Sequence, residues 1–398
     1  MQEHTQHQLE AASMESKSGA AGRIRQVWRH NLEQEMAVLR QLVLKYPYVS
    51  MDAEFPGIVA RPIGNFAGSK AEYHYQTLRC NVDLLKPIQL GITLWNIEGE
   101  LPPQQPDQSL LSSMGTRNPY PNNLLYLPCT WVFNFKFSLD EDMFSAPSIE
   151  LLQNSGIEFQ KNSEMGIDLD AFGSLLTTSG LVFSEDVHWL SFHSGYDFGY
   201  LIKLLTSQGL PEEQNGFFEV VSTYFPKLWD IKFILRHAQR MHSTNRLAPD
   251  AARIIAQLGT RSGLQDLADE LQCSRIGPAH TGGSDAWLTG QVFWAMRSKI
   301  FNGELDDSLS DQIYGLHGVA MPASQQYRDE FFAAQGTPQQ QVNGLSYAAG
   351  HTPNNPSTPT TSHAGLHHSN QTPGPQYGHN MGGGSLGAAG FGNFQYGK

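Results

Sequence analysis

Three short segments carry side chains that could bind a metal ion or move a proton. Asp52 and Glu54 end an apolar run, Asp197 follows the apolar residues 189–192, and His280 precedes Asp285 across a glycine-containing loop. Residues two apart in a strand point to the same face, so Asp52 and Glu54 would present two carboxylates together. Hard divalent cations bind clustered oxygens of this kind, and a neutral imidazole can accept a proton from water near pH 7.

Each segment taken alone also has a structural explanation. An acidic pair at a strand end is commonly a solvated turn, and an aspartate at a helix start serves as a cap or complements the helix dipole. Together, however, Asp52, Glu54, Asp197 and Asp285 could meet at one edge of a sheet. Four carboxylates there could hold two divalent cations about 3.5–4 Å apart, as in phosphoryl hydrolysis, with His280 as the general base. Without metal, like charges so close would raise each other's pKa.

Hydrophobic periodicity predicts the elements that must position these residues. Strands early in the chain, followed by alternating helices and strands, indicate one α/β domain with a mixed central sheet flanked by helices. Residues 262–265 have the sequence of a capping box at a helix start. The predicted strands are 48–52, 88–95, 131–137, 189–192 and 228–231, and the predicted helices are 23–45, 75–85, 148–154, 169–177, 198–206, 212–224, 231–240, 264–271 and 284–301.

Charge is spread unevenly along the 398 residues, which hold 26 Lys or Arg, 38 Asp or Glu and a net charge of -12. Residues 331–397 contain no Asp, Glu, Lys or Arg, so we expect a low-complexity, disordered tail at 319–398. The Gln-, Glu- and Ser-rich residues 1–22 are expected to form a disordered leader, which leaves a folded body at 23–318. No run approaches the ~18 apolar residues of a membrane span, so no membrane contact is expected. The three separated cysteines fit a reducing compartment. An acidic body argues against a broad surface that coats nucleic acid, but not against local binding of a nucleic acid end through metal ions.

The order Asp-x-Glu, Asp, His-x4-Asp resembles the DEDD exonucleases of the ribonuclease H-like superfamily, in the subgroup with a catalytic histidine. Longer blocks are similar to CAF/Pop-type poly(A) deadenylases. They are YVSMDAEFPG at 48–57, LRCNVDLLK at 78–86, WLSFHSGYDFGY at 189–200, and Gly283-Ser284-Asp285 followed by Leu288-Thr289-Gly290. The resemblance covers about residues 24–318. It departs from the family's short form at 102–128 and 236–260, where the connections are longer.

The resemblance implies roles for the matching positions. Asp52, Glu54, Asp197 and Asp285 would bind two Mg2+ or Mn2+ ions, with Asp52 as the bridge, and His280 would be the general base. Four flanking residues are weaker expectations for substrate binding, with structural alternatives: Phe55 and His193 at the terminal nucleotide, Arg61 and Lys203 at phosphates.

The activity implied is shortening of mRNA poly(A) tails from the 3′ end with release of AMP, by a catalytic subunit of the CCR–NOT complex. The expected partners are the poly(A) RNA 3′ end, the CCR–NOT scaffold and a second deadenylase subunit, in the cytoplasm and with the nucleus as a second location. One alternative is an exonuclease acting on structured RNA or DNA, because carboxylates do not choose a base. Another is a catalytically weak or silent scaffold that links a second nuclease to the NOT platform.

Overall fold

A mixed β-sheet lies at the centre of this computed structural model, which describes residues 23–63, 70–105 and 127–317. The strands are β1 (Ile24–Val27), β2 (Tyr48–Glu54), β3 (Gln89–Trp95), β4 (Thr130–Asn134), β5 (His188–Ser191) and β6 (Leu228–Asp230). They lie in the order β1-β4-β3-β2-β5-β6. β3 is antiparallel to β2 and β4, whereas β1, β5 and β6 run parallel to a neighbour. The predicted mixed sheet is confirmed.

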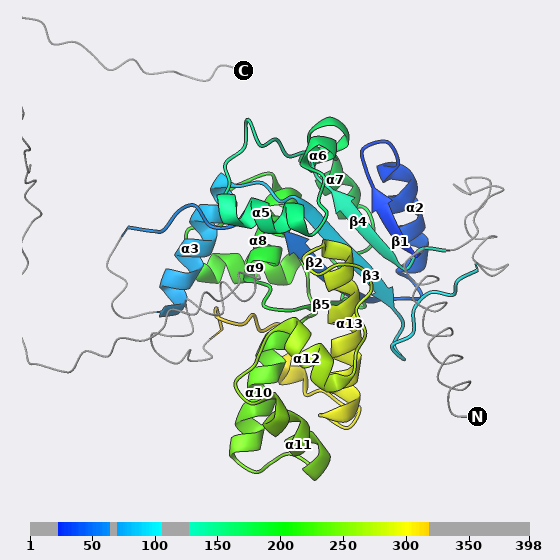
Figure 1. Cartoon of the computed structure of the whole chain (residues 1–398), viewed down its shortest axis with the longest axis vertical. Helices are drawn as coiled ribbons and strands as arrows, with labels where there is room; N and C mark the ends of the chain where they lie inside the picture. The colour runs from blue at the N-terminus through cyan, green and yellow to red at the C-terminus, as the bar shows by residue number, and fades with distance from the viewer. Residues whose placement is uncertain (1–22, 64–69, 106–126, 318–398) are drawn as a thin grey trace, which may run out of the picture. The chain divides into compact units, whose positions relative to one another are not determined.

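Helices cover both faces of the sheet (Figure 1). One hydrophobic core joins β2, β3 and β4 to α2 (Leu32–Leu42), α3 (Lys70–Leu84), α7 (Leu169–Thr177), α8 (Gly195–Thr206) and α9 (Gln214–Tyr224). A second core joins β5 and β6 to α10 (Ile231–Ser243), α11 (Pro249–Leu258), α12 (Leu264–Leu271) and α13 (Gly282–Lys299). Two more helices, α5 (Ala146–Asn154) and α6 (Phe159–Met165), complete the α-helices among the described residues.

The alternation of side chains along β2 decides which residues reach the second helical layer. Val49 and Met51 are buried in the first core, and Ala53 packs against it. Ser50, Asp52 and Glu54 alternate with them and therefore point to the opposite face. That face is the one on which α13 packs (Figure 1). The two carboxylates of β2 are thus directed toward α13 by strand geometry alone.

The predicted helix 23–45 is wrong in its first part. Residues Ile24–Val27 form β1, which pairs in parallel with β4, and the helix α2 begins only at Leu32. A turn separates the two, closed by a 2.7 Å hydrogen bond from the Trp28 N–H to the Asn31 side chain. Apolar residues at three- and four-residue steps suit a helix. In Ile24–Val27, however, the backbone N–H and C=O groups bond to the distant strand β4 instead of to a helical turn.

One further expectation needs correction at the start of α12, and one helix was not predicted. The capping box over 262–265 does not form, because Gly263 is the N-cap and its N–H donates to the Asp266 carboxylate at 3.2 Å. Ser262 instead accepts hydrogen bonds from the Lys232 ammonium. The longer connection at 236–260 contains the end of α10 and the whole of α11, a helix that was not predicted from the sequence.

Several sequence expectations fall on residues outside the described ranges. They are the disordered leader at 1–22, the low-complexity tail at 319–398 and most of the insertion at 102–128, of which 106–126 is not described. Among the described helices, none combines the length and hydropathy that a membrane span requires.

Candidate active site

Three of the predicted carboxylates converge at the carboxyl end of β2, a strand that lies between β3 and β5 within the sheet. Asp52 and Glu54 come from β2 and Asp285 from the first turn of α13. Each offers one oxygen, and these oxygens lie within 4.8 Å of one another. Residues more than 230 positions apart thereby form one acidic group with oxygen-only donors, which fits a hard divalent cation.

A glycine in the neighbouring strand makes this approach of α13 possible. Gly91 pairs with Asp52 in the antiparallel register of β2 and β3. A Cβ atom at position 91 would lie 1.8 Å from the Gly282 carbonyl oxygen and 2.6 Å from the Gly283 nitrogen. Only a residue without a side chain lets the start of α13 reach the sheet there. An isolated glycine inside a strand pattern is a known sign of close backbone approach, so the sequence carried a signal for it.

The fourth carboxylate, Asp197, lies next to this group but is not among the residues whose oxygens lie within 4.8 Å of one another. It is in the first turn of α8, which begins directly after β5, and it is 8% exposed. Its Oδ1 accepts a hydrogen bond from the Ala53 N–H at 2.8 Å. The bond joins the start of α8 to β2 between Asp52 and Glu54. The N-cap of α8 is Ser194, so capping does not explain Asp197.

Burial and mutual repulsion perturb the carboxyl groups strongly. Burial, followed by the negative charges of neighbouring carboxylates, raises the pKa of Asp52 and of Glu54 well above the usual range. Burial also raises the pKa of Asp197 to about 7, against the stabilising N–H of Ala53. The Arg275 guanidinium acts in the opposite direction on Asp52 and Glu54. The site is therefore arranged to gain stability from added positive charge.

Cation binding should consequently stabilise the protein more at high pH than at low pH. In the metal-free protein, the raised pKa of Asp197 means that its ionisation lowers stability as pH rises from about 4 through 7. A cation needs the ionised groups and offsets their repulsion. We expect the increase in unfolding midpoint caused by Mn2+ to be larger at pH 8 than at pH 5, by differential scanning fluorimetry against EDTA. Equal increases at both pH values would contradict this linkage.

His280 lies in the loop that leads into α13. Its backbone N–H donates to Asp285 Oδ2 at 2.8 Å, and its φ of +59° is in the left-handed region. The residue is half-buried. This bond ties the predicted general base to a predicted metal ligand through the backbone, while the role of its imidazole stays a prediction.

The two aromatic residues predicted at the terminal nucleotide have different surroundings. Phe55, next to Glu54, stacks on Tyr196 with ring centroids 5.0 Å apart and remains half-buried. His193 has a positive φ of 62° and packs edge-on against Tyr314. Burial lowers the pKa of His193 well below the usual range. The structure therefore packs Phe55, next to Glu54 in the sequence, against α8 and the first core, and places His193 in a separate aromatic cluster.

The two cationic residues predicted at phosphates also differ. Arg61 is exposed, in the segment that leads to residue 63. The Lys203 ammonium donates to three carbonyl oxygens at the end of α3, those of Val82 at 2.8 Å, Asp83 at 3.0 Å and Leu85 at 3.0 Å. This arrangement favours a helix-capping role for Lys203 over a phosphate contact.

Asp230 supports the site and was not singled out from the sequence. It is fully buried, and it accepts hydrogen bonds from the N–H groups of His193 at 3.0 Å, Ser194 at 3.2 Å and Tyr314 at 3.0 Å. It thereby fixes the turn from which α8, with Asp197, starts. Asp230 is also the N-cap of α10, and an aspartate directly before a predicted helix was the available signal.

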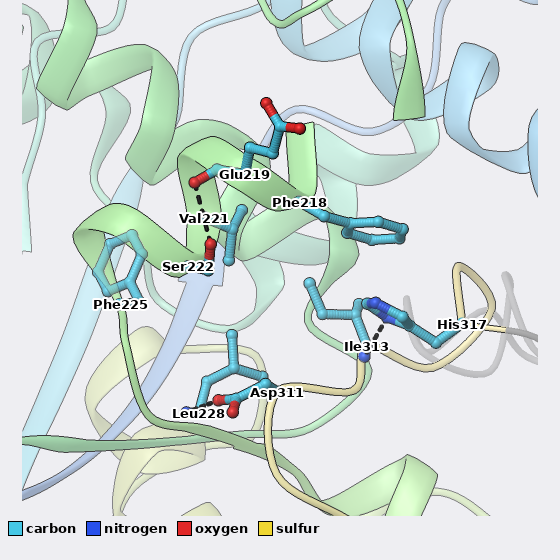
Figure 2. A pocket seen from close by; sticks show the side chains of 9 residues that line it. All are labelled: Phe218, Glu219, Val221, Ser222, Phe225, Leu228, Asp311, Ile313 and His317. Atoms are coloured by element: carbon cyan, nitrogen blue, oxygen red, sulfur yellow. Dashed lines mark hydrogen bonds between the residues drawn. The ribbon is translucent and has the colours of Figure 1, made fainter. Parts of the chain in front are cut away.

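A separate pocket of about 230 Å³ lies between α9, β6 and the segment 311–317 (Figure 2). Its wall includes Phe218, whose ring stacks on His317 at 3.8 Å, and Asp311, which accepts the Leu228 N–H at 3.1 Å. None of its lining residues is one of the predicted site residues.

Comparison with known sequences places this arrangement in a family. The model of the CAF1 family ribonucleases matches residues 27–169 and 181–293. The relative named "Poly(A) ribonuclease pop2" from Schizosaccharomyces pombe is 44% identical over 306 residues, covering 77% of this chain and 78% of the relative. "CCR4-NOT transcription complex subunit 7" from Caenorhabditis elegans is 42% identical over 279 residues, covering 70% and 77%.

Solved structures agree with the sequence comparison. The Mg2+- and Mn2+-bound form of S. pombe Pop2p has a TM-score of 0.61 and 45% identity, covering 74% of this chain and 100% of that one. The structure of the yeast NOT1 MIF4G domain co-crystallized with CAF1 matches with a TM-score of 0.54 and 31% identity. This match covers 73% of this chain and 96% of that one. The sheet, the converging carboxylates and these matches lead to one conclusion: the chain belongs to the CAF1 family of ribonucleases.

Proposed function

We propose that this chain is a metal-dependent 3′-to-5′ exoribonuclease that shortens mRNA poly(A) tails and releases AMP. The observation that carries the chemistry is the convergence of Asp52, Glu54 and Asp285 within 4.8 Å. The substrate is supported by membership of the CAF1 ribonucleases and by the relative named as a poly(A) ribonuclease. An acidic pocket that binds an RNA end through metal ions also fits a net charge of -12.

The carboxylates would hold two divalent cations, Mg2+ or Mn2+. Their oxygen-only donor set fits both ions, and the related S. pombe structure in its Mg2+- and Mn2+-bound form supports the choice. Asp52 would be shared by the two ions, and Asp197 would complete the set. When bound, the cations supply positive charge that activates water and offsets the charge developing on the phosphate.

The protein's own residues would then orient the reaction. The His280 imidazole accepts the proton of the attacking water, and its loop is held by the bond from its N–H to Asp285. The Phe55 ring, fixed against Tyr196 beside Glu54, offers a surface on which a terminal base can stack. Stacking alone accepts any base, so adenine preference must come from further contacts.

The proposed setting is the CCR–NOT complex. A related CAF1 protein has been co-crystallized with the MIF4G domain of NOT1, and a relative is named as a subunit of the complex. We therefore propose a NOT1-type scaffold as a partner, together with a second deadenylase subunit and action in the cytoplasm and nucleus. Pull-down of the purified full chain by a NOT1 MIF4G domain would test the scaffold contact directly.

Purified full-length protein should shorten an adenylate-tailed RNA in the presence of Mn2+ faster than a uridylate-tailed RNA of the same length. The products should be nucleoside monophosphates, because nucleotides are removed from the 3′ end of the RNA one at a time. Gel analysis of both RNAs with chromatography of the products would measure this. Equal rates on both tails would overturn the adenylate preference but leave the nuclease. Absence of shortening on any tail would favour the silent scaffold.

A further inference from the structure

Arg275 lies in the loop before α13 and bridges two helices through its guanidinium group. Its Nε donates to Gln265 Oε1 on α12 at 2.8 Å. Its Nη1 donates to Asp285 Oδ1 at 2.5 Å and to Ser284 Oγ at 3.1 Å on α13. The side chains of Arg275 and Asp285 are only 15% and 11% exposed, so this ion pair is not a solvated surface contact.

The bridge leaves the Asp285 carboxylate with little rotational freedom. Arg275 binds Oδ1, while the His280 N–H binds Oδ2 at 2.8 Å. Both partners belong to one loop, residues 272–281, so the loop holds the carboxylate from two sides. A carboxylate has about four lone-pair sites, so each oxygen can accept one such bond and still face a cation.

We propose that Arg275 is a positioning residue, which holds Asp285 in the orientation that binds the cation and holds the loop that carries His280. The inference rests on the proposed metal-dependent function and extends it to a residue outside the Asp-x-Glu, Asp, His-x4-Asp pattern. Partners that orient a ligand from outside commonly change metal affinity by about 10–100-fold. Arginine suits this task because its planar fork makes several directed bonds at once, whereas lysine carries a single compact charge.

A competing role predicts the opposite sign. Arg275 carries positive charge close to a site that would take positive ions, and a bystander charge there would repel them. If repulsion dominated, removing the charge would tighten cation binding. If positioning dominates, removal weakens binding. The two anchors of Arg275, on α12 and on α13, favour positioning because a charge needs no second anchor.

Calorimetric titration of metal-stripped, full-length protein with Mn2+ separates these roles without an activity assay. We expect the Mn2+ dissociation constant to rise about 10–100-fold in Arg275→Gln. The rise should be smaller in Arg275→Lys, which keeps a positive charge near Asp285. Gln265→Ala should weaken binding a few-fold without changing any charge, because only the far anchor is lost. Arg261→Gln is the matched control, because Arg261 is a half-exposed arginine that forms an ion pair with Glu270. This substitution should leave Mn2+ binding unchanged.

The outcomes are distinct for the two levels of the argument. An unchanged or lower Mn2+ dissociation constant in folded Arg275→Gln would overturn the positioning role. If Arg275→Gln does not fold, unchanged Mn2+ binding in both Gln265→Ala and Arg275→Lys would overturn it. Circular dichroism and the unfolding midpoint of each variant show that folded protein is titrated. Failure of the wild type to bind Mn2+ would overturn the proposed metal site itself, which is a different result from loss of the Arg275 effect.

Discussion

An Asp52→Asn variant should lose on the order of 10³-fold or more of the exonuclease rate while remaining folded. The amide keeps the shape of the side chain but removes a ligand charge from the centre of the carboxylate group. In the metal-free protein the same change should raise the unfolding midpoint, because burial and three neighbouring negative charges raise the pKa of Asp52 in the native state. A catalytic loss together with a gain in stability is not expected from a merely structural aspartate.

The matched control for this variant is Asp168→Asn. Asp168 caps α7 through hydrogen bonds from Asp170 and Ala171, away from the carboxylate group. It should lose up to about 1 kcal/mol of stability, as cap substitutions do, and retain its activity. Both rates would be measured on one adenylate-tailed RNA with saturating Mn2+. Retention of more than about a tenth of the rate in Asp52→Asn would argue against its role as a shared ligand.

A Gly91→Ala variant should lose about 10²-fold of activity and about 1–3 kcal/mol of stability. The new Cβ would lie 1.8 Å from the Gly282 carbonyl oxygen, which belongs to backbone and cannot rotate aside. The start of α13 must therefore move away from the sheet, and Asp285 moves with it. Because Asp52 is paired directly opposite Gly91, the displacement should separate Asp285 from Asp52.

Gly209→Ala provides the comparison for this substitution. A Cβ at position 209 would meet the Asp83 carboxyl group at 3.4 Å, an ordinary contact. Its activity and its Mn2+ affinity should match the wild type. Thermal unfolding and Mn2+ calorimetry on both alanine variants would separate a displaced α13 from general damage. Wild-type Mn2+ affinity in Gly91→Ala would show that the carboxylates do not depend on this close approach.

Local pattern was sufficient to locate the main parts of the candidate site. Alternation along β2 placed Asp52 and Glu54 on one face, a strand-to-helix transition placed Asp197 in the first turn of α8, and a glycine-containing loop before a helical pattern placed Asp285 in the first turn of α13. These features follow from the periods of the strand and the helix, which depend on neighbouring residues only. The mixed sheet followed from the order of such elements.

Other features depend on partners that are distant in the chain. β1 has the periodicity of a helix, and only pairing with β4 makes it a strand. The Lys203 ammonium binds carbonyl oxygens at the end of α3, whereas its sequence context left a phosphate contact and an ordinary surface salt link open. A side chain's partner is set by how the elements pack, and no local period encodes it.

Residue types and spacing were enough to indicate the family, the chemistry that the carboxylates could perform and most of the elements that present them. Packing of distant elements brings Asp285 to Asp52 across Gly91, joins the Ala53 N–H to Asp197 and lets Arg275 hold Asp285. The physical reason is that residue type and spacing set which face a side chain occupies, whereas contact between distant faces depends on close packing of backbone and side chains throughout the folded core.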